Sequence, residues 1–159
     1  MKILGIDPGY GILGWSVIEK SLKLIDYGTI ETCSSNNIDE RIFIIHNELS
    51  KIISHYKPDC VAIEKLFFSK NTKTAIDVAK AIGAILLTVR IADLEYFEYT
   101  PLQVKQAITG FGRASKSQVE IMLKKLYNVK NIHGPDDAAD AVAVATCHSF
   151  RNNITNLKV

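Results

Sequence analysis

Two hydrophobic patterns follow each other along this 159-residue chain: the alternation typical of strands, and the three- to four-residue spacing typical of helices. Their order constrains the fold more than any other feature of the sequence. Three short apolar or alternating runs, separated by turns with glycine or lysine and serine, predict an antiparallel meander over residues 2–7, 12–19 and 23–32. From residue 37 to about residue 56 apolar side chains recur every three or four positions, which predicts a helix that ends before Pro58. The apolar, β-branched run 60–63 then predicts a buried strand parallel to the first one, reached by a right-handed crossover.

The second half of the chain predicts one more strand among several helices. An apolar helix is expected over 72–93, an aromatic-rich strand over 96–99, and further helices over 101–109, 115–127 and 136–149. We therefore expect an α/β fold with a five-stranded mixed sheet, three antiparallel strands followed by two parallel ones, and helices on both faces. A single domain should cover residues 1–150, with residues 151–159 as a flexible tail.

Composition excludes several classes of protein. The formal net charge is only +2, so any nucleic-acid surface has to be a local basic patch rather than the whole chain. The three cysteines are widely spaced and form no CxxC pair, which favours a reducing, cytoplasmic location. The uncharged apolar stretch 81–89 is far shorter than the roughly 20 residues that span a bilayer, and the N-terminus lacks a signal-peptide pattern. No membrane association is expected.

Two acids fall at the ends of predicted strands. Asp7 ends the first strand and begins the turn Asp-Pro-Gly-Tyr-Gly, and Glu64 follows the apolar strand 60–63. Because parallel neighbours end at the same edge of a sheet, Asp7 and Glu64 should converge there. The alternatives are a turn aspartate that bonds its own backbone, and a surface glutamate paired with a lysine such as Lys65.

Two more acids stand in the last predicted helix. Asp140 lies a full turn inside a run of alanine and valine, where an unpaired charge would be costly to bury. Asp137 is three residues earlier and therefore shares its helical face. Asp136 or Asp137 could instead cap the start of this helix.

Together, Asp7, Glu64, Asp137 and Asp140 would form a cluster that repels itself unless divalent cations occupy it. Oxygen-only ligands suit Mg²⁺, with Mn²⁺ as a substitute, rather than Zn²⁺. The chemistry expected of such a cluster is phosphodiester hydrolysis, with two ions about 4 Å apart clamping the scissile phosphate.

Five segments in register extend this interpretation. GIDPG, AIEKLFFSKN, VKQAITGFG, ASKSQV and DDAADAVAVA closely resemble the RuvC family of Holliday junction resolvases, which belongs to the ribonuclease H-like superfamily, over nearly the whole chain. The resemblance places the catalytic acids of that family on Asp7, Glu64, Asp137 and Asp140. Some members carry histidine at the third acid, whereas this chain has Asp137. The resemblance also implies a homodimer that makes paired nicks in four-way junction DNA, leaves 5′-phosphate and 3′-hydroxyl ends, and works with a RuvA–RuvB branch-migration complex.

Candidate DNA contacts lie in two segments. The stretch 65–71 combines two aromatic residues with two lysines, and Phe67, which matches a base-contacting position of the family, could stack on or wedge apart bases there. Lys70 lies in the same stretch, and both phenylalanines could instead fill the core. Lys105, Arg113 and Lys116 flank the glycine-rich GFGRAS loop, where backbone N–H groups at a helix start can also receive a phosphate. The apolar helix over 74–91 is a candidate dimer contact, with packing on the sheet as the alternative.

Three other functions remain open at this point. An actin-like ATPase or sugar kinase also begins with a strand and an Asp-Gly phosphate loop, but it needs a second nucleotide-binding domain. A related small nuclease, such as a YqgF-like enzyme, could act on RNA or on other branched DNA. A binding-only module could keep the fold without turnover, although the complete set of acids argues against it.

Overall fold

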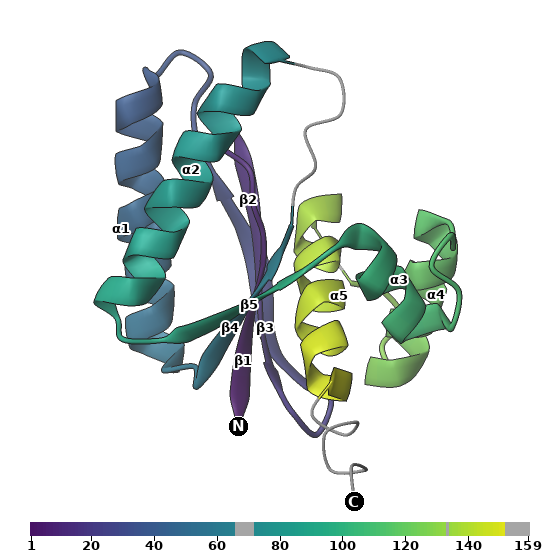
Figure 1. Ribbon diagram of the computed structural model, residues 1–159. Helices are drawn as coiled ribbons and strands as arrows, with labels where there is room; N and C mark the ends of the chain where they lie inside the picture. The colour runs from purple at the N-terminus through teal and green to yellow at the C-terminus, as the bar shows by residue number, and fades with distance from the viewer. Residues whose placement is uncertain (66–71, 133, 152–159) are drawn as a thin grey trace, which may run out of the picture.

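A five-stranded sheet forms the centre of the molecule (Figure 1). The computed structural model describes residues 1–65, 72–132 and 134–151. The strands are β1 (Lys2–Asp7), β2 (Ile12–Glu19), β3 (Lys23–Glu31), β4 (Cys60–Glu64) and β5 (Glu95–Tyr99), in the spatial order β3-β2-β1-β4-β5. The first three strands pair antiparallel, whereas β4 pairs parallel to both β1 and β5. The predicted mixed sheet is confirmed.

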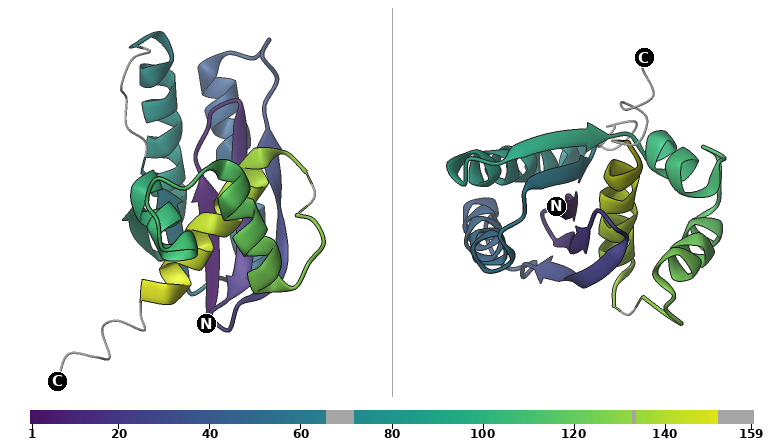
Figure 2. Two further views of the ribbon diagram at one scale, coloured as in Figure 1. Left: turned by 90° about the vertical axis from the view of Figure 1, so that its right-hand side faces the viewer. Right: turned by 90° about the horizontal axis from the view of Figure 1, so that it is seen from below.

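Helices cover both faces of this sheet (Figures 1 and 2). On one face lie α1 (Ile38–Tyr56) and α2 (Thr72–Ile91). On the other lies α5 (Asp136–Arg151), with α3 (Pro101–Thr109) and α4 (Lys116–Tyr127) packed outside it. Among the described residues, none of these helices has the length and apolarity to cross a membrane.

The element boundaries follow from local chemistry. Ser115 caps α4, because its hydroxyl accepts the backbone N–H of Gln118 while the Gln118 side chain accepts that of Ser115. Lys57 ends α1 in a left-handed conformation directly before Pro58. At the other end of the chain, α5 runs two residues beyond its predicted limit, so Arg151, which we expected in the tail, is helical. Residues 152–159 lie outside the described part of the chain.

The twofold alternation of the strands decides which side chains face which helices. Leu4 and Ile6 of β1 join the core beneath α1 and α2, together with Val61 and Ile63 of β4. The intervening residues face the other way, and Ile3 joins the core beneath α5. Asp7 continues the series of Ile3, so its side chain belongs to the α5 face of the sheet. Glu64 does the same on β4, because Cys60 and Ala62 also lie in the core beneath α5.

Candidate active site

Two carboxylates stand side by side at one edge of the sheet. The β1–β4 ladder pairs Ile6 with Ile63, and Asp7 and Glu64 are the next residue on each strand. Both are partly exposed, unlike the buried isoleucines before them. The parallel pairing therefore brings together two acids that are far apart in the sequence.

The first turns of α5 bring two further carboxylates to the same edge. Asp137 and Asp140 are partly exposed, while Ala138 and Ala141 beside them are buried against the sheet. The pKa of Asp7 is raised to about 8, first by burial and then by the charges of Glu64, Asp140 and Asp137. The other three acids thus lie within electrostatic range of Asp7.

Glu64 has a different balance of neighbours. Burial raises the pKa of its carboxyl, and the charge of Asp140 raises it further. Two cations, Lys105 and Lys116, act in the opposite direction. The charge of Glu64 is therefore disfavoured by burial and by one neighbouring acid, and favoured by two lysines.

Lys116, at the start of α4, contacts the first two turns of α5. Its ammonium group lies 2.9 Å from a carboxylate oxygen of Asp140 and 3.1 Å from one of Asp136. Burial opposes its positive charge, but the hydrogen bonds to these two acids outweigh that effect and raise the pKa of Lys116. Asp136, which the sequence suggested as a helix cap, is the first residue of α5 and makes an ion pair between two helices.

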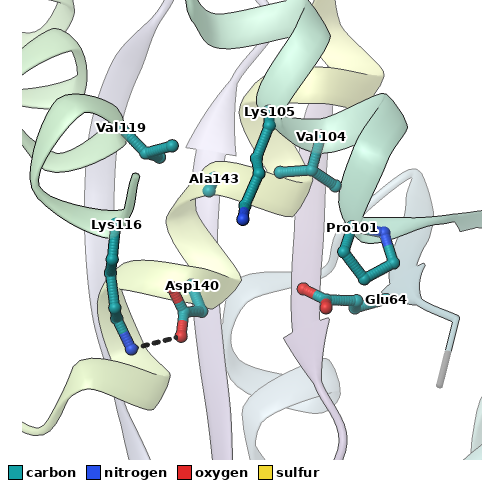
Figure 3. Close-up of a pocket in the computed structure, with 8 residues that line it drawn as sticks. All are labelled: Glu64, Pro101, Val104, Lys105, Lys116, Val119, Asp140 and Ala143. Carbon is teal, nitrogen blue, oxygen red and sulfur yellow. Dashed lines mark hydrogen bonds and ion pairs between the residues drawn. The ribbon is translucent and has the colours of Figure 1, made fainter. Parts of the chain in front are cut away.

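A pocket of about 240 Å³ opens beside the acids (Figure 3). Glu64 and the ammonium group of Lys105 point into it from one side, and Asp140 with Lys116 bounds the other. Apolar side chains complete its lining: Pro101, Val104, Val119 and Ala143. The pocket can therefore bind an anionic group through its lysines and contact the apolar part of the same ligand through its apolar lining.

The donor chemistry of the cluster fits a hard divalent cation. All four side chains offer oxygen, and the raised pKa of Asp7 shows that its charge lacks sufficient compensation from the protein. Within the described residues, no three His, Cys, Asp or Glu side chains lie at the spacing of a coordination shell.

The remaining candidates are distributed as follows. Lys105 and Lys116 line the pocket, whereas Arg113 is exposed in the loop between α3 and α4. Phe67 and Lys70 lie outside the described residues. Sequence reasoning missed the ion pairs of Lys116, because nothing in the spacing shows that α4 packs against the start of α5. It also missed the apolar lining of the pocket, which sits on three separate elements.

Comparison with known proteins gives one consistent result. Residues 3–148 match the family model described as crossover junction endodeoxyribonuclease RuvC. A protein of that name from Halothermothrix orenii is 52% identical over 158 residues, covering 96% of each chain. One from Caldicellulosiruptor saccharolyticus is 53% identical over 152 residues, covering 93% of this chain and 92% of its own. The solved structure of Thermus thermophilus RuvC in complex with a Holliday junction substrate superimposes with a TM-score of 0.90, at 33% identity, over 98% of this chain and 96% of that one.

Proposed function

The chain belongs to the RuvC family of crossover junction endodeoxyribonucleases, and from this premise we propose that it resolves Holliday junctions by paired, symmetric phosphodiester hydrolysis. The observation that carries the proposal is the electrostatic influence of Glu64, Asp137 and Asp140 on Asp7, beside a pocket that Lys105 and Lys116 line. An actin-like ATPase would need a second nucleotide-binding domain, whereas the match to RuvC covers nearly the whole of this chain and of its relatives.

The four acids act in this proposal as ligands rather than as proton donors. Asp7, Glu64, Asp137 and Asp140 would hold divalent cations, Mg²⁺ in the cell with Mn²⁺ as a substitute. When bound, these ions supply activation of the attacking water and stabilisation of the departing 3′ oxygen. Cleavage on that side of the phosphorus leaves 5′-phosphate and 3′-hydroxyl ends.

The lysines hold the substrate in place. Lys105 and Lys116 border the pocket, where their ammonium groups can contact the non-bridging oxygens of the scissile phosphate and its neighbour. Arg113, exposed in the loop between α3 and α4, extends this basic surface along the DNA strand. We further propose that Phe67 stacks on a base at the crossover and that Lys70 contacts the backbone nearby.

A direct test compares three substrates of equal length: a four-way junction, a linear duplex and an RNA–DNA hybrid, each with Mg²⁺ or with EDTA. We expect cleavage of the junction alone, and only with Mg²⁺. Mapping the products should show cuts at symmetric positions on two strands of like polarity, with ends that DNA ligase seals. Equal cleavage of all three substrates would contradict junction selectivity, and preference for the hybrid would favour a ribonuclease.

Phe67→Ala is expected to slow the cleavage of intact junctions by about 10- to 100-fold, because loss of one stacked base removes roughly 1 to 3 kcal/mol. Single-turnover cleavage measures this effect, and thermal denaturation checks the fold. A melting temperature close to that of the unaltered protein is expected. A large drop in melting temperature would instead place Phe67 in the core.

Paired nicking requires two active sites, and we propose that a homodimer provides them through α2 and α1. One side of α2 packs on the sheet through Ala81, Ile85 and Val89, as the alternative interpretation of this helix required. Its other side exposes Leu87 and Ile91, at 60% and 67%, beside the equally exposed Phe43 of α1. These side chains line one shallow apolar groove, which is the kind of surface that association buries.

Leu87→Asp is expected to turn the dimer into a monomer, because it places a charge in the centre of this groove. Sedimentation measures the change, and a plasmid with an extruded cruciform measures its consequence. Paired cuts give linear plasmid, so the monomer should give nicked circles instead. Ile121→Asp on α4, where a side chain 52% exposed is altered in the same way, is the matched control. Dimeric Leu87→Asp protein would contradict this interface.

Two further expectations rest on family membership. A RuvA–RuvB branch-migration complex should deliver the junction to this protein, and both should act in the cytoplasm, where the chromosome is. The thiols of Cys60 and Cys147 are buried and unpaired by disulfides, which is compatible with a reducing compartment.

A further inference from the structure

Gly14 lies at the point where the sheet and the last helix bring their acids together. It is paired directly with Asp7 in the β1–β2 ladder, so the two residues share the face that α5 covers. A Cβ atom at position 14 would overlap the carbonyl oxygen and carbon of Asp137, and it would lie 3.1 Å from the backbone nitrogen of Ala138. Gly14 therefore touches one acid through the strand ladder and another through the helix.

Conformational freedom does not account for this glycine. Among the described residues, the glycines with positive φ are Gly110 and Gly134, so Gly14 has a backbone that any residue adopts. What position 14 lacks is space. The atoms that meet its Cβ belong to the backbone of α5, and a backbone cannot turn aside as the end of a side chain can.

The position of Gly14 along α5 gives it a specific effect. Gly5, the other glycine beneath this helix, meets the carbonyl of Ala141 and lies 2.8 Å from the Cβ of Ala145 once a Cβ is added. The contacts of a Cβ atom at position 5 are thus with residues of α5 that follow Asp140, whereas those of a Cβ atom at position 14 are with Asp137 itself. A side chain at position 14 would lift the first turn of α5 away from the edge where Asp7 stands.

We infer that Gly14 is a positioning residue of the metal site: its missing side chain lets α5 approach β2 closely enough for Asp137 to act with Asp7 on one cation. The inference rests on the proposed nuclease function, which supplies the reason for the site. The close packing of α5 on the sheet would then matter for the chemistry, because the distance between helix and sheet sets the distance between the two ligands, Asp137 and Asp7.

The test measures Mn²⁺ binding to DNA-free protein by calorimetry, so that it does not depend on cleavage. Gly14→Ala is expected to weaken Mn²⁺ binding by about 10- to 100-fold, the usual cost of misplacing a metal ligand. Junction affinity in EDTA should stay within about threefold, because the surface that binds DNA is unchanged, while the single-turnover rate falls. Unaltered Mn²⁺ affinity would overturn the inference.

Two control variants separate positioning from lost stability. Gly11→Ala alters a glycine in the same β1–β2 segment that has open space around it, and it should bind Mn²⁺ normally. Leu49→Ala removes a buried side chain of α1 from the core on the opposite face of the sheet, and it should lower the melting temperature without changing Mn²⁺ affinity. Equal loss of Mn²⁺ affinity in Leu49→Ala, or failure of Gly14→Ala to fold even in the cold, would show that Gly14 serves the core and not the acids.

A compensating substitution gives the sharpest test. Asp137→Glu lengthens the side chain by one methylene, so alone it should weaken Mn²⁺ binding, but in Gly14→Ala protein it should recover part of the loss. Simple addition of the two defects would overturn the inference. If the unaltered protein bound Mn²⁺ in this pattern yet left four-way junctions uncut, the proposed function would fail while the role of Gly14 stood.

Discussion

Asp7→Asn is expected to abolish junction cleavage and, in EDTA at pH 8, to make the protein more stable than the unaltered chain. Cleavage is lost because the substitution puts a neutral amide where the site needs a charged ligand. We expect a fall of at least about 10³-fold in single-turnover rate, comparable to removing a principal electrostatic group. Junction binding in EDTA should persist, since Asp7 is proposed to bind the cations and not the DNA.

The gain in stability follows from the pKa of Asp7, which folding raises from 3.8 to about 8. Between these pH values the folded protein holds a proton that the unfolded chain releases, so the free energy of unfolding falls as pH rises from about 4 to about 8. An asparagine side chain does not titrate, and the variant should therefore gain relative stability over that window, on the order of 1 to 3 kcal/mol at pH 8.

Thermal denaturation at pH 5, 6.5 and 8 in EDTA measures this gain. The difference in melting temperature between the variant and the unaltered protein should widen as pH rises. Glu98→Gln, at an exposed position of β5, is the control and should show no such widening. A variant that melts earlier at every pH, and no longer binds junctions, would make Asp7 a structural turn residue.

Lys116→Gln is expected to lower the single-turnover cleavage rate by about 100-fold, because it removes the cation that stands among the acids and faces the pocket. This ammonium group is paired with Asp136 and Asp140, and its charge opposes the rise in the pKa values of Asp7 and Glu64. Without it the cluster becomes more repulsive and the phosphate loses one contact.

Junction affinity should change far less than the rate, by about threefold to tenfold, because one phosphate contact is a small part of a DNA interface. Lys125→Gln is the matched control: Lys125 is exposed further along the same helix, and its variant should cleave normally. Lys116→Arg should recover part of the rate by keeping the charge. Equal cleavage rates for Lys116→Gln and Lys125→Gln would show that Lys116 has no role in cleavage.

Much of the fold could be predicted from the sequence because its signals are local. Alternation indicated the strands, three- and four-residue spacing indicated the helices, and the predicted boundaries agree with those of the structure to within about two residues. The convergence of Asp7 and Glu64 followed from one rule of topology, since parallel neighbours end together. Asp140 was singled out by the cost of burying charge in a helix of small residues, and Asp137 by the three-residue spacing that places it on the same helical face.

What could not be predicted depends on contacts between elements far apart in the sequence. The ion pairs of Lys116 depend on how α4 packs against α5, and Gly14 resembles any strand glycine until a helix is seen to lie on it. His148 is a further example: it is buried in the core, where a ring nitrogen is hydrogen-bonded to the Tyr99 hydroxyl at 2.7 Å, and this contact joins α5 to β5.

The division of the four acids between the sheet and α5 has a consequence for the cell. Asp7 and Glu64 are synthesised early, whereas Asp137 and Asp140 belong to the last described helix, which follows every strand in the chain. An unfinished chain, or one in which α5 is detached from the sheet, would therefore carry half of the proposed metal site and should not cleave DNA. The proposed nuclease would in this way stay inactive until its folding is complete.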